Sequence, residues 1–229
     1  IRVDEPRPLA AAVELLEHRH GVVITYEDPI YRHESDLADV TLRVRKGLGQ
    51  PSAHRVLIPR AAALHIQYSI SDENHIDLPA VVQKLLRAHA EGSNPGVFRL
   101  TTQSDGALHL VPDSVKGANG QIVKARSILD AKISFAQNER TGFETLRLIL
   151  DEVERLEPAE EVKKVAIGLV PMNTLHSQKV WIGATEEPAR KVLWRLMAGL
   201  GRKLSWQFFY DPGLKWYVFN SHVVPDAPA

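Results

Sequence analysis

The chain has 229 residues, and its 28 Lys and Arg residues balance its 28 Asp and Glu residues, so the formal net charge is zero. This balance excludes a whole-molecule field that attracts nucleic acid or an anionic membrane surface, so an electrostatic partner must meet a local patch. The sequence has no cysteine, which excludes disulfides, thiol catalysis and Cys-ligated metal centres, and it has no run of the roughly 18 apolar residues that a membrane-spanning helix needs.

The first predicted elements are a helix over residues 8–20 and a strand over residues 22–26. Leu9, Val13 and Leu16 recur at helical spacing, and Gly21 ends the run. The β-rich stretch "VVITY" follows and stops at the turn-forming "EDP".

A strand, a second helix and a hairpin come next. "LHIQYSI" (64–70) alternates apolar and polar residues, as a half-buried strand does. Asp77 is the predicted N-cap of a helix that ends near Gly92 and whose apolar face is Val81, Val82, Leu85 and Leu86. "VFRL" and "ALHLV" then form a hairpin through "SDG".

The second half repeats this order. A strand at 128–135 leads to "TGFE", a capping box in which Thr141 and Glu144 start a helix. Strands follow at 165–170 and 179–184. The next helix carries Val192, Leu193, Leu196 and Met197 at the spacing of the earlier apolar face, and "KLSWQFFY" and "LKWYVFN" make the last hairpin.

The repeated order predicts an α+β protein of two tandem βαββαββ-type small domains, with mixed sheets each covered by two helices. The first domain is expected over residues 1–114, with an inserted hairpin at about 28–60, and the second over 122–229. The polar, glycine-containing stretch 115–121 is the predicted linker.

Both halves resemble the secretin and TonB short N-terminal domain, a small module at the periplasmic front of secretins and of signal-transducing outer-membrane receptors. The resemblance is carried by "PLAAAVELLEHRHGVVITYEDP" and "IQYSISDENHIDLPAVVQKLLRAHAEG" in the first half, and by "ISFAQNERTGFETLRLILDEV" and "VWIGATEEPARKVLWRLMAGLGRKLSW" in the second. It implies a periplasmic or otherwise extracytoplasmic module that binds another protein in signalling or assembly. The family pattern contains no catalytic residues.

The insertion contains a cluster of basic residues. Residues 40–60 have no acid, and the alternating "DVTLRVRK" and returning "HRVLIPR" predict a basic hairpin. Its candidate binding residues for an acidic surface are Arg43, Arg45, Lys46, Arg55 and Arg60. The alternative is a solvated strand face whose charges prevent unwanted strand pairing.

No motif in the sequence supports catalysis, a metal or a cofactor. His18 and His20 diverge by roughly 200° on a helix, so they do not form a joint metal site. "YRHESD" (31–36) gathers residue types of acyl transfer, but there is no GxSxG, HExxH or Walker motif, so we interpret it as a polar loop.

All four tryptophans lie in the second half. In the last hairpin we expect Trp206 and Trp216 to be buried under the preceding helix. Phe209, Tyr217 and Phe219 are expected to share the other face and to contact a partner or the first domain.

The sequence therefore predicts a non-enzymatic interaction module whose partner is another protein, with no nucleic acid, no membrane span and no cofactor. The oligomeric state is open. Two alternatives remain. One is a carbohydrate or cell-wall binding module, for which exposed tryptophans would line a groove. The other is an enzyme, for which His33, Glu34 and Asp36 would converge in a cleft.

Overall fold

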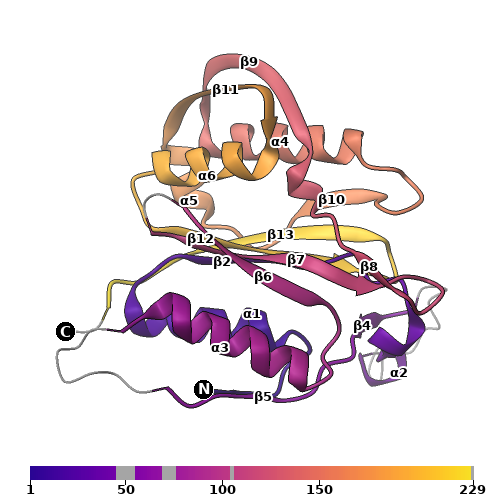
Figure 1. Cartoon of the computed structure of the whole chain (residues 1–229). Helices are drawn as coiled ribbons and strands as arrows, with labels where there is room; N and C mark the ends of the chain where they lie inside the picture. The colour runs from indigo at the N-terminus through magenta and orange to yellow at the C-terminus, as the bar shows by residue number, and fades with distance from the viewer. Residues whose placement is uncertain (45–54, 69–75, 104–105, 228–229) are drawn as a thin grey trace.

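The computed structural model describes residues 1–44, 55–68, 76–103 and 106–227, and it confirms the α+β class. A central mixed sheet lies between two pairs of helices, α1 with α3 and α4 with α6 (Figure 1). Each helix pair is covered on its outer side by a two-stranded sheet, β1 with β5 or β9 with β11. None of the described helices is long and apolar enough to cross a membrane.

In the first half the elements run from a short N-terminal strand to the long strand β7. Their bounds are β1 Arg2–Val3, α1 Pro8–His20, β2 Ile24–Glu27, the 3-10 turn η1 Glu34–Asp36, β3 Leu37–Asp39, α2 Thr41–Val44, β4 Leu57–Pro59, β5 Leu64–His65, α3 Leu78–Glu91, β6 Val97–Thr102 and β7 Leu108–Lys116.

In the second half the outer strands are much longer. The bounds are β8 Ile122–Lys124, the 3-10 turn η2 Ile128–Asp130, β9 Lys132–Thr141, α4 Gly142–Leu156, β10 Lys164–Ile167, α5 Met172–Ser177, β11 Lys179–Pro188, α6 Ala189–Gly199, β12 Leu204–Asp211 and β13 Trp216–Val223.

The helices begin and end where their capping residues predict. Pro8 opens α1, and Gly21 closes it in the left-handed region at φ 62°. The Asp77 side chain accepts from the Ala80 N–H at the start of α3. The predicted capping box of α4 is present, with Thr141 and Glu144 each accepting from the other's backbone N–H.

The two halves share one topology. In the central sheet the strand order β2-β7-β6 recurs as β10-β13-β12, with one parallel and one antiparallel pair in each set. A helix glutamate also recurs: Glu17 accepts from the N–H of Ile24, and Glu154 accepts from the N–H of Val165, each at or next to the start of the equivalent strand. The repetition predicted from the sequence is therefore a repetition of pairing as well as of element order.

The two sets of strands join into one sheet, which differs from the two separate sheets expected from the sequence. Strand β12 pairs parallel with β2, placing Gln207 beside Tyr26 and Phe208 beside Glu27. Strands β2 and β7 run with β12, whereas β13 and β10 run against it. The second set is thus turned by half a turn relative to the first, which puts the two helix pairs on opposite faces (Figure 1). Whether each range folds alone stays a prediction.

Two cores lie on the two faces of this sheet. One packs α1 and α3 against β2, β6 and β7 around Leu16, Leu85 and Leu110. The other packs α4 and α6 against β10, β12 and β13 around Leu150, Leu193 and Phe208. Each helix pair fills one face, as layered α+β packing requires.

The predicted linker is part of a hairpin. Val115 is buried in β7, and β7 turns back into β8 with the Gly117 N–H donating to the Gln121 carbonyl at 2.8 Å. The polar and glycine content of 115–121 therefore serves a tight turn, in which Gly120 has φ 79°.

Candidate protein interface at the open sheet edges

The central sheet ends in two edges that have no partner strand within the described part of the chain. One edge is β6, and the other is β10. Each edge strand pairs on its inner side only, β6 with β7 and β10 with β13. An edge of this kind presents a row of backbone N–H and C=O groups for a further strand.

Exposed apolar side chains lie beside both edges. Near β6 the side chain of Val97 is 41% exposed and lines a cavity together with Ile122, which is 65% exposed and lies on β8 at the other side of β7. Next to β10 the side chain of Leu169 is 83% exposed, and Trp216 on β13 is 38% exposed. Apolar surface next to unpaired backbone is the combination that a docked strand covers.

A buried ion pair stabilises the internal joint between β12 and β2. Glu27, at the end of β2, is 1% exposed, and its carboxylate accepts from Arg190 of α6 at 2.7 and 2.8 Å and from the Ser127 hydroxyl. Arg190 also donates to Asp130. Burial alone lowers the pKa of Arg190, but the nearby Glu27 and Asp130 carboxylates outweigh burial and raise it.

Asp28 forms a second buried polar centre at the same joint. Its Oδ2 accepts from Arg7 at 2.6 Å and from the Tyr210 N–H at 3.0 Å, and its Oδ1 accepts from the hydroxyl of Tyr26 at 2.7 Å. Burial, and then the Asp28 charge, raise the pKa of Tyr26, so its hydroxyl remains a donor. We call Glu27, Asp28, Arg7 and Arg190 the joint clamp.

Sequence reasoning missed the joint clamp because "EDP" reads as a turn. The available signal was two adjacent acids directly after an apolar strand, since carboxylates at the end of a buried strand need cationic partners.

The basic hairpin exists in part, with different strands from those expected. Its paired strands are β3 and β4, and the segment that was expected to start the hairpin forms the short helix α2. Arg43 lies exposed in α2, Arg55 pairs with Asp39 at 2.8 Å, and Arg60 donates to the Leu37 carbonyl. Arg45 and Lys46 lie outside the described residues. Among the described members, Arg55 and Arg60 already have partners within the hairpin.

The prediction that Phe209, Tyr217 and Phe219 share one face is wrong. Phe219 lies opposite Phe208, and Tyr217 lies opposite Tyr210, so both belong to the core under α4 and α6 at 0% and 1% exposure. Phe209 points the other way into the first core, with its ring 6.1 Å from that of Tyr26 and 4.6 Å from the Arg7 guanidinium. Phe209 thus contacts the first half of the chain. The sequence had suggested either this contact or contact with a partner.

Of the two tryptophans of the last hairpin, Trp206 is buried as predicted and Trp216 is not. Trp206 is buried, with its ring 5.9 Å from that of Trp194. Trp216 is partly exposed at the start of β13. Because Trp216 faces away from α4 and α6, it belongs to the surface beside the β10 edge.

The polar loop does not form a catalytic cleft. His33 Nδ1 lies 2.8 Å from Ser35 Oγ in an exposed turn, and Lys116 donates to Ser35 and to Asp36. Of His33, Glu34 and Asp36, only Asp36 lines the nearby cavity. Contacts between neighbours in a 3-10 turn stabilise the turn and do not hold a base and a nucleophile on separate supports. Within the described ranges no group of three His, Cys, Asp or Glu residues has the arrangement of a metal site.

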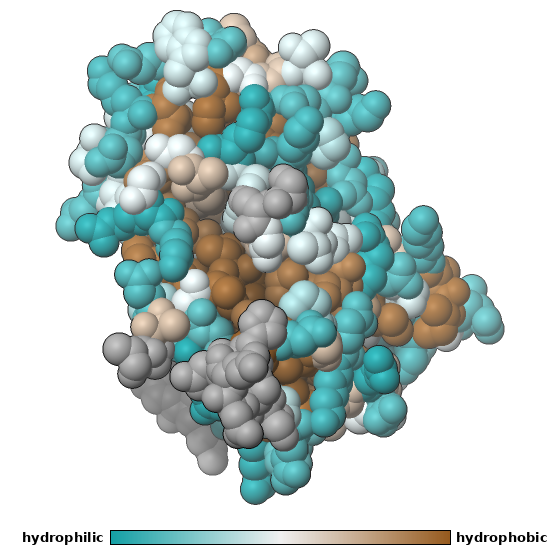
Figure 2. Space-filling model, turned by 60° about the vertical axis from the view of Figure 1, so that its left-hand side comes forward, coloured by the Kyte–Doolittle hydropathy of each residue, from teal (hydrophilic) through white to brown (hydrophobic). Residues whose placement is uncertain are grey.

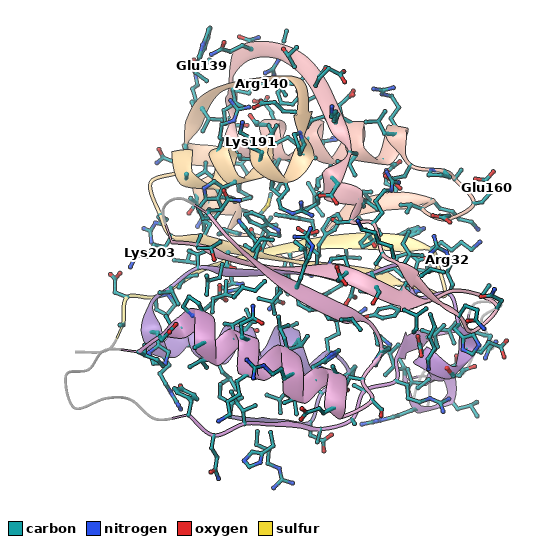
Figure 3. The ribbon with its side chains drawn as sticks, in the orientation of Figure 1. Arg32, Glu139, Arg140, Glu160, Lys191 and Lys203 are labelled. Carbon is teal, nitrogen blue, oxygen red and sulfur yellow. The ribbon has the colours of Figure 1, made fainter. Side chains whose placement is uncertain are left out.

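An apolar cavity of about 490 Å³ lies between the two helix layers at one end of the sheet. Its walls include Val22, Val23, Trp194, Met197 and Leu204, and Arg202 and Lys203 are its basic residues. Figure 3 labels Lys203 at this end of the molecule, and Figure 2, which turns that side forward, shows apolar side chains gathered between polar ones. Lys203 pairs with Asp226 at 2.9 Å, whereas Arg202 has no ion pair with another described residue.

No family model matches this chain, and comparisons with curated proteins and with solved structures also gave no match.

Proposed function

We propose that the chain is a non-enzymatic interaction and assembly module, which binds an extended segment of another protein along an open edge of its central sheet. The observation that carries this proposal is the joint between β12 and β2. There the edge strand of one set already accepts the edge strand of the other in a parallel pair. The equivalent strands at the outer edges, β6 and β10, have no partner among the described residues.

Strand addition suits these edges physically. Backbone hydrogen bonds along the strand give affinity for any extended segment, and the side chains on each face give specificity. At β6 the flanking apolar residue is Val97, and at β10 the flanking apolar residues are Leu169 and Trp216. A bound strand with apolar side chains on matching positions would cover them.

The compartment belongs to the same proposal. The resemblance of both halves to the secretin and TonB short N-terminal domain favours a periplasmic or otherwise extracytoplasmic site of action, in signalling or assembly. The recurring order of helices and strands along the two halves supports that resemblance because the family module is itself a βαββαββ unit.

A photo-crosslinking experiment tests the proposal in the cells that make the protein. A photoreactive amino acid replaces Thr102, an exposed residue of β6, or Lys164 of β10, with Asp151 on the exposed face of α4 as the matched control. We expect defined protein adducts from the two edge positions and none from Asp151. Adducts at Asp151 alone, or none at either edge, would contradict the proposal.

A second candidate function is the binding of a small apolar molecule with an acidic group in the cavity beside Trp194. The apolar walls and the unpaired Arg202 favour such a ligand, because pockets of this size bind through apolar walls and a few fixed polar groups. Dodecanoate is a suitable probe, with Trp fluorescence as the readout. Arg202→Glu should weaken binding about tenfold, which corresponds to about 1.4 kcal/mol. Arg32→Glu, at the opposite end of the molecule in Figure 3, should leave it unchanged. Equal binding by all three proteins would refute this candidate.

A further inference from the structure

We propose that the partner at the open edges is a second copy of this chain, with β6 of one copy pairing parallel to β10 of the next. This inference rests on the proposed function and specifies its partner. Its basis is that the chain already makes this joint once: β12 is the counterpart of β6, and β2 is the counterpart of β10. The open edges β6 and β10 can therefore pair with each other in the same way as β12 pairs with β2.

The strand residues can be matched one by one. Tyr26 pairs with Leu110 and packs against the helices of the first half. Ile167 pairs with Phe219 and packs against the helices of the second half. Likewise Leu100 pairs with Leu110, as Phe208 pairs with Phe219. Ile167 is thus the counterpart of Tyr26, and Leu100 is the counterpart of Phe208.

This correspondence predicts the register between copies. At the internal joint Gln207 lies beside Tyr26 and Phe208 beside Glu27. Between copies, Arg99 therefore lies beside Ile167, and Leu100 lies beside Gly168. Any other register would place different residues of β6 beside Ile167, so the prediction is specific.

A backbone donor for the new joint is present at the right position. In the internal joint the Asp28 N–H donates to the Phe208 carbonyl at 2.8 Å. The counterpart of Asp28 is Leu169, whose N–H donates to the side-chain Oδ1 of Asn220 at 2.9 Å in the single chain. On assembly this N–H is free to exchange the Asn220 side chain for the Leu100 carbonyl of the neighbouring copy.

The layers are compatible with this contact. Across the internal joint the helix pairs lie on opposite faces of the sheet, so neither pair blocks the other (Figure 1). Repeating the same half-turn places α4 and α6 of the next copy on the face of β6 that lacks α1 and α3. A head-to-tail contact of this type is heterologous, so it continues from copy to copy unless a ring closes.

The joint between copies is expected to be weaker than the internal one. The counterparts of Glu27 and Asp28 at the end of β10 are Gly168 and Leu169, which cannot form the ion pairs of the joint clamp. Backbone pairing and the covering of Leu169 and Val97 remain. The assembly is therefore reversible and depends on protein concentration.

Disulfide trapping tests the register directly, because the chain has no cysteine of its own. Two full-length variants, Arg99→Cys and Ile167→Cys, are mixed and oxidised. Neighbouring strands lie about 4.8 Å apart, which is within the Cα separation that a disulfide spans. The matched control replaces Arg99→Cys with Thr101→Cys, whose Cα would lie about 8 Å from that of residue 167 and beyond disulfide reach.

We expect a disulfide that joins the Arg99→Cys chain to the Ile167→Cys chain, and its loss with the Thr101→Cys control. Crosslinks only within one variant, or equal crosslinking by the control, would overturn the register and the head-to-tail contact. No crosslink in any mixture would overturn self-assembly. Photo-adducts from Thr102 to a different protein would then leave the proposed function standing, whereas their absence would refute both.

Discussion

The first and second halves of the chain differ in two respects, although their central strands pair in the same way. The outer sheet of the first half has two residues in each strand, β1 and β5, whereas β9 and β11 of the second half have ten each. The strand β2 ends at Glu27 and is followed by Asp28, whereas its counterpart β10 is followed by Gly168 and Leu169. Both halves have the same set of central strands with its helix pair. They differ in the outer sheet and in the residues at the end of β2 or β10.

The difference in charge between the ends of β2 and β10 shows how the same topology gives one closed joint, between β12 and β2, and two open edges, at β6 and β10. A buried carboxylate is stable only with cationic partners, so the joint clamp exists only where Arg7 and Arg190 reach β2. At β10 the same positions are apolar or glycine and remain at the surface. The clamp therefore distinguishes a permanent joint from a reversible one.

The largest expected effect comes from removing one partner of the joint clamp. Arg190→Met leaves Glu27 as an unpaired charge at 1% exposure, so the free energy of unfolding should fall by about 3 to 5 kcal/mol. The control Lys179→Met removes an exposed ion pair with Glu139 and should cost less than about 1 kcal/mol. Urea denaturation measures both. A small loss for Arg190→Met would show that the clamp does not stabilise the joint.

The two tryptophans of the last hairpin give a similar contrast between core and edge. Trp206→Ala removes a fully buried ring and should cost about 3 to 5 kcal/mol in unfolding free energy. Trp216→Ala, 38% exposed beside the β10 edge, should cost much less and should reduce self-association instead. Equal losses of stability would place Trp216 in the core.

The first half should respond to pH through His89, which is buried at 4% exposure beside Phe98. Burial lowers the pKa of His89 from 6.5 to about 4, so the unfolded chain binds more protons between these values. Stability from the neutral imidazole is present above pH 6.5 and is lost as the pH falls toward 4. The loss is about 3 kcal/mol. Relative to wild type, His89→Leu should show a shallower fall in unfolding free energy across this window, and an unchanged slope would contradict the assignment.

A smaller effect should distinguish the first helices of the two halves. Helix α4 has a capping box at Thr141, whereas α1 begins after Arg7 without a side-chain cap. Thr141→Ala should lower the midpoint of thermal unfolding through a loss of about 1 kcal/mol, and Thr141→Ser should retain most of the stability. If both variants melt alike, the cap contributes nothing.

Local signals predicted the longer helices α1, α3, α4 and α6, whereas the short helices α2 and α5 and the pairing between distant segments were not predicted. Helix α1 ends and helix α3 begins as expected because Gly21 and Asp77 act within their own turns. The pairing of β12 with β2 joins residues about 180 positions apart, and no local pattern encodes it. Strand alternation was also misleading at Thr41, whose N–H donates to Asp39 and starts α2 instead.

The loop between β12 and β13 decides which aromatic side chains of the two strands share a face. Successive side chains of β12 and of β13 point to alternate faces of the hairpin, so the sequence correctly predicts which residues of one strand share a face. The loop places Trp216 opposite Asp211, which puts Tyr217 beside Tyr210 and Phe219 beside Phe208. A loop one residue longer or shorter would have placed Tyr217 and Phe219 on the face of Phe209, as expected from the sequence. The basic hairpin and the open edges likewise depend on partners that the sequence pattern does not reveal.

Sedimentation velocity across a wide range of protein concentrations tests most directly whether the β6 and β10 edges join copies. The alternation that follows the Gln103 to Ala107 hydrogen bond turns the Leu100 N–H outward, so Leu100→Pro removes an edge donor without removing a bond to β7. We predict that the wild-type sedimentation coefficient rises with concentration past that of a dimer, and that the Leu100→Pro chain, shown to be folded by circular dichroism, remains a monomer. A wild-type chain that stays monomeric at every concentration, or a folded Leu100→Pro chain that assembles equally well, would contradict the account.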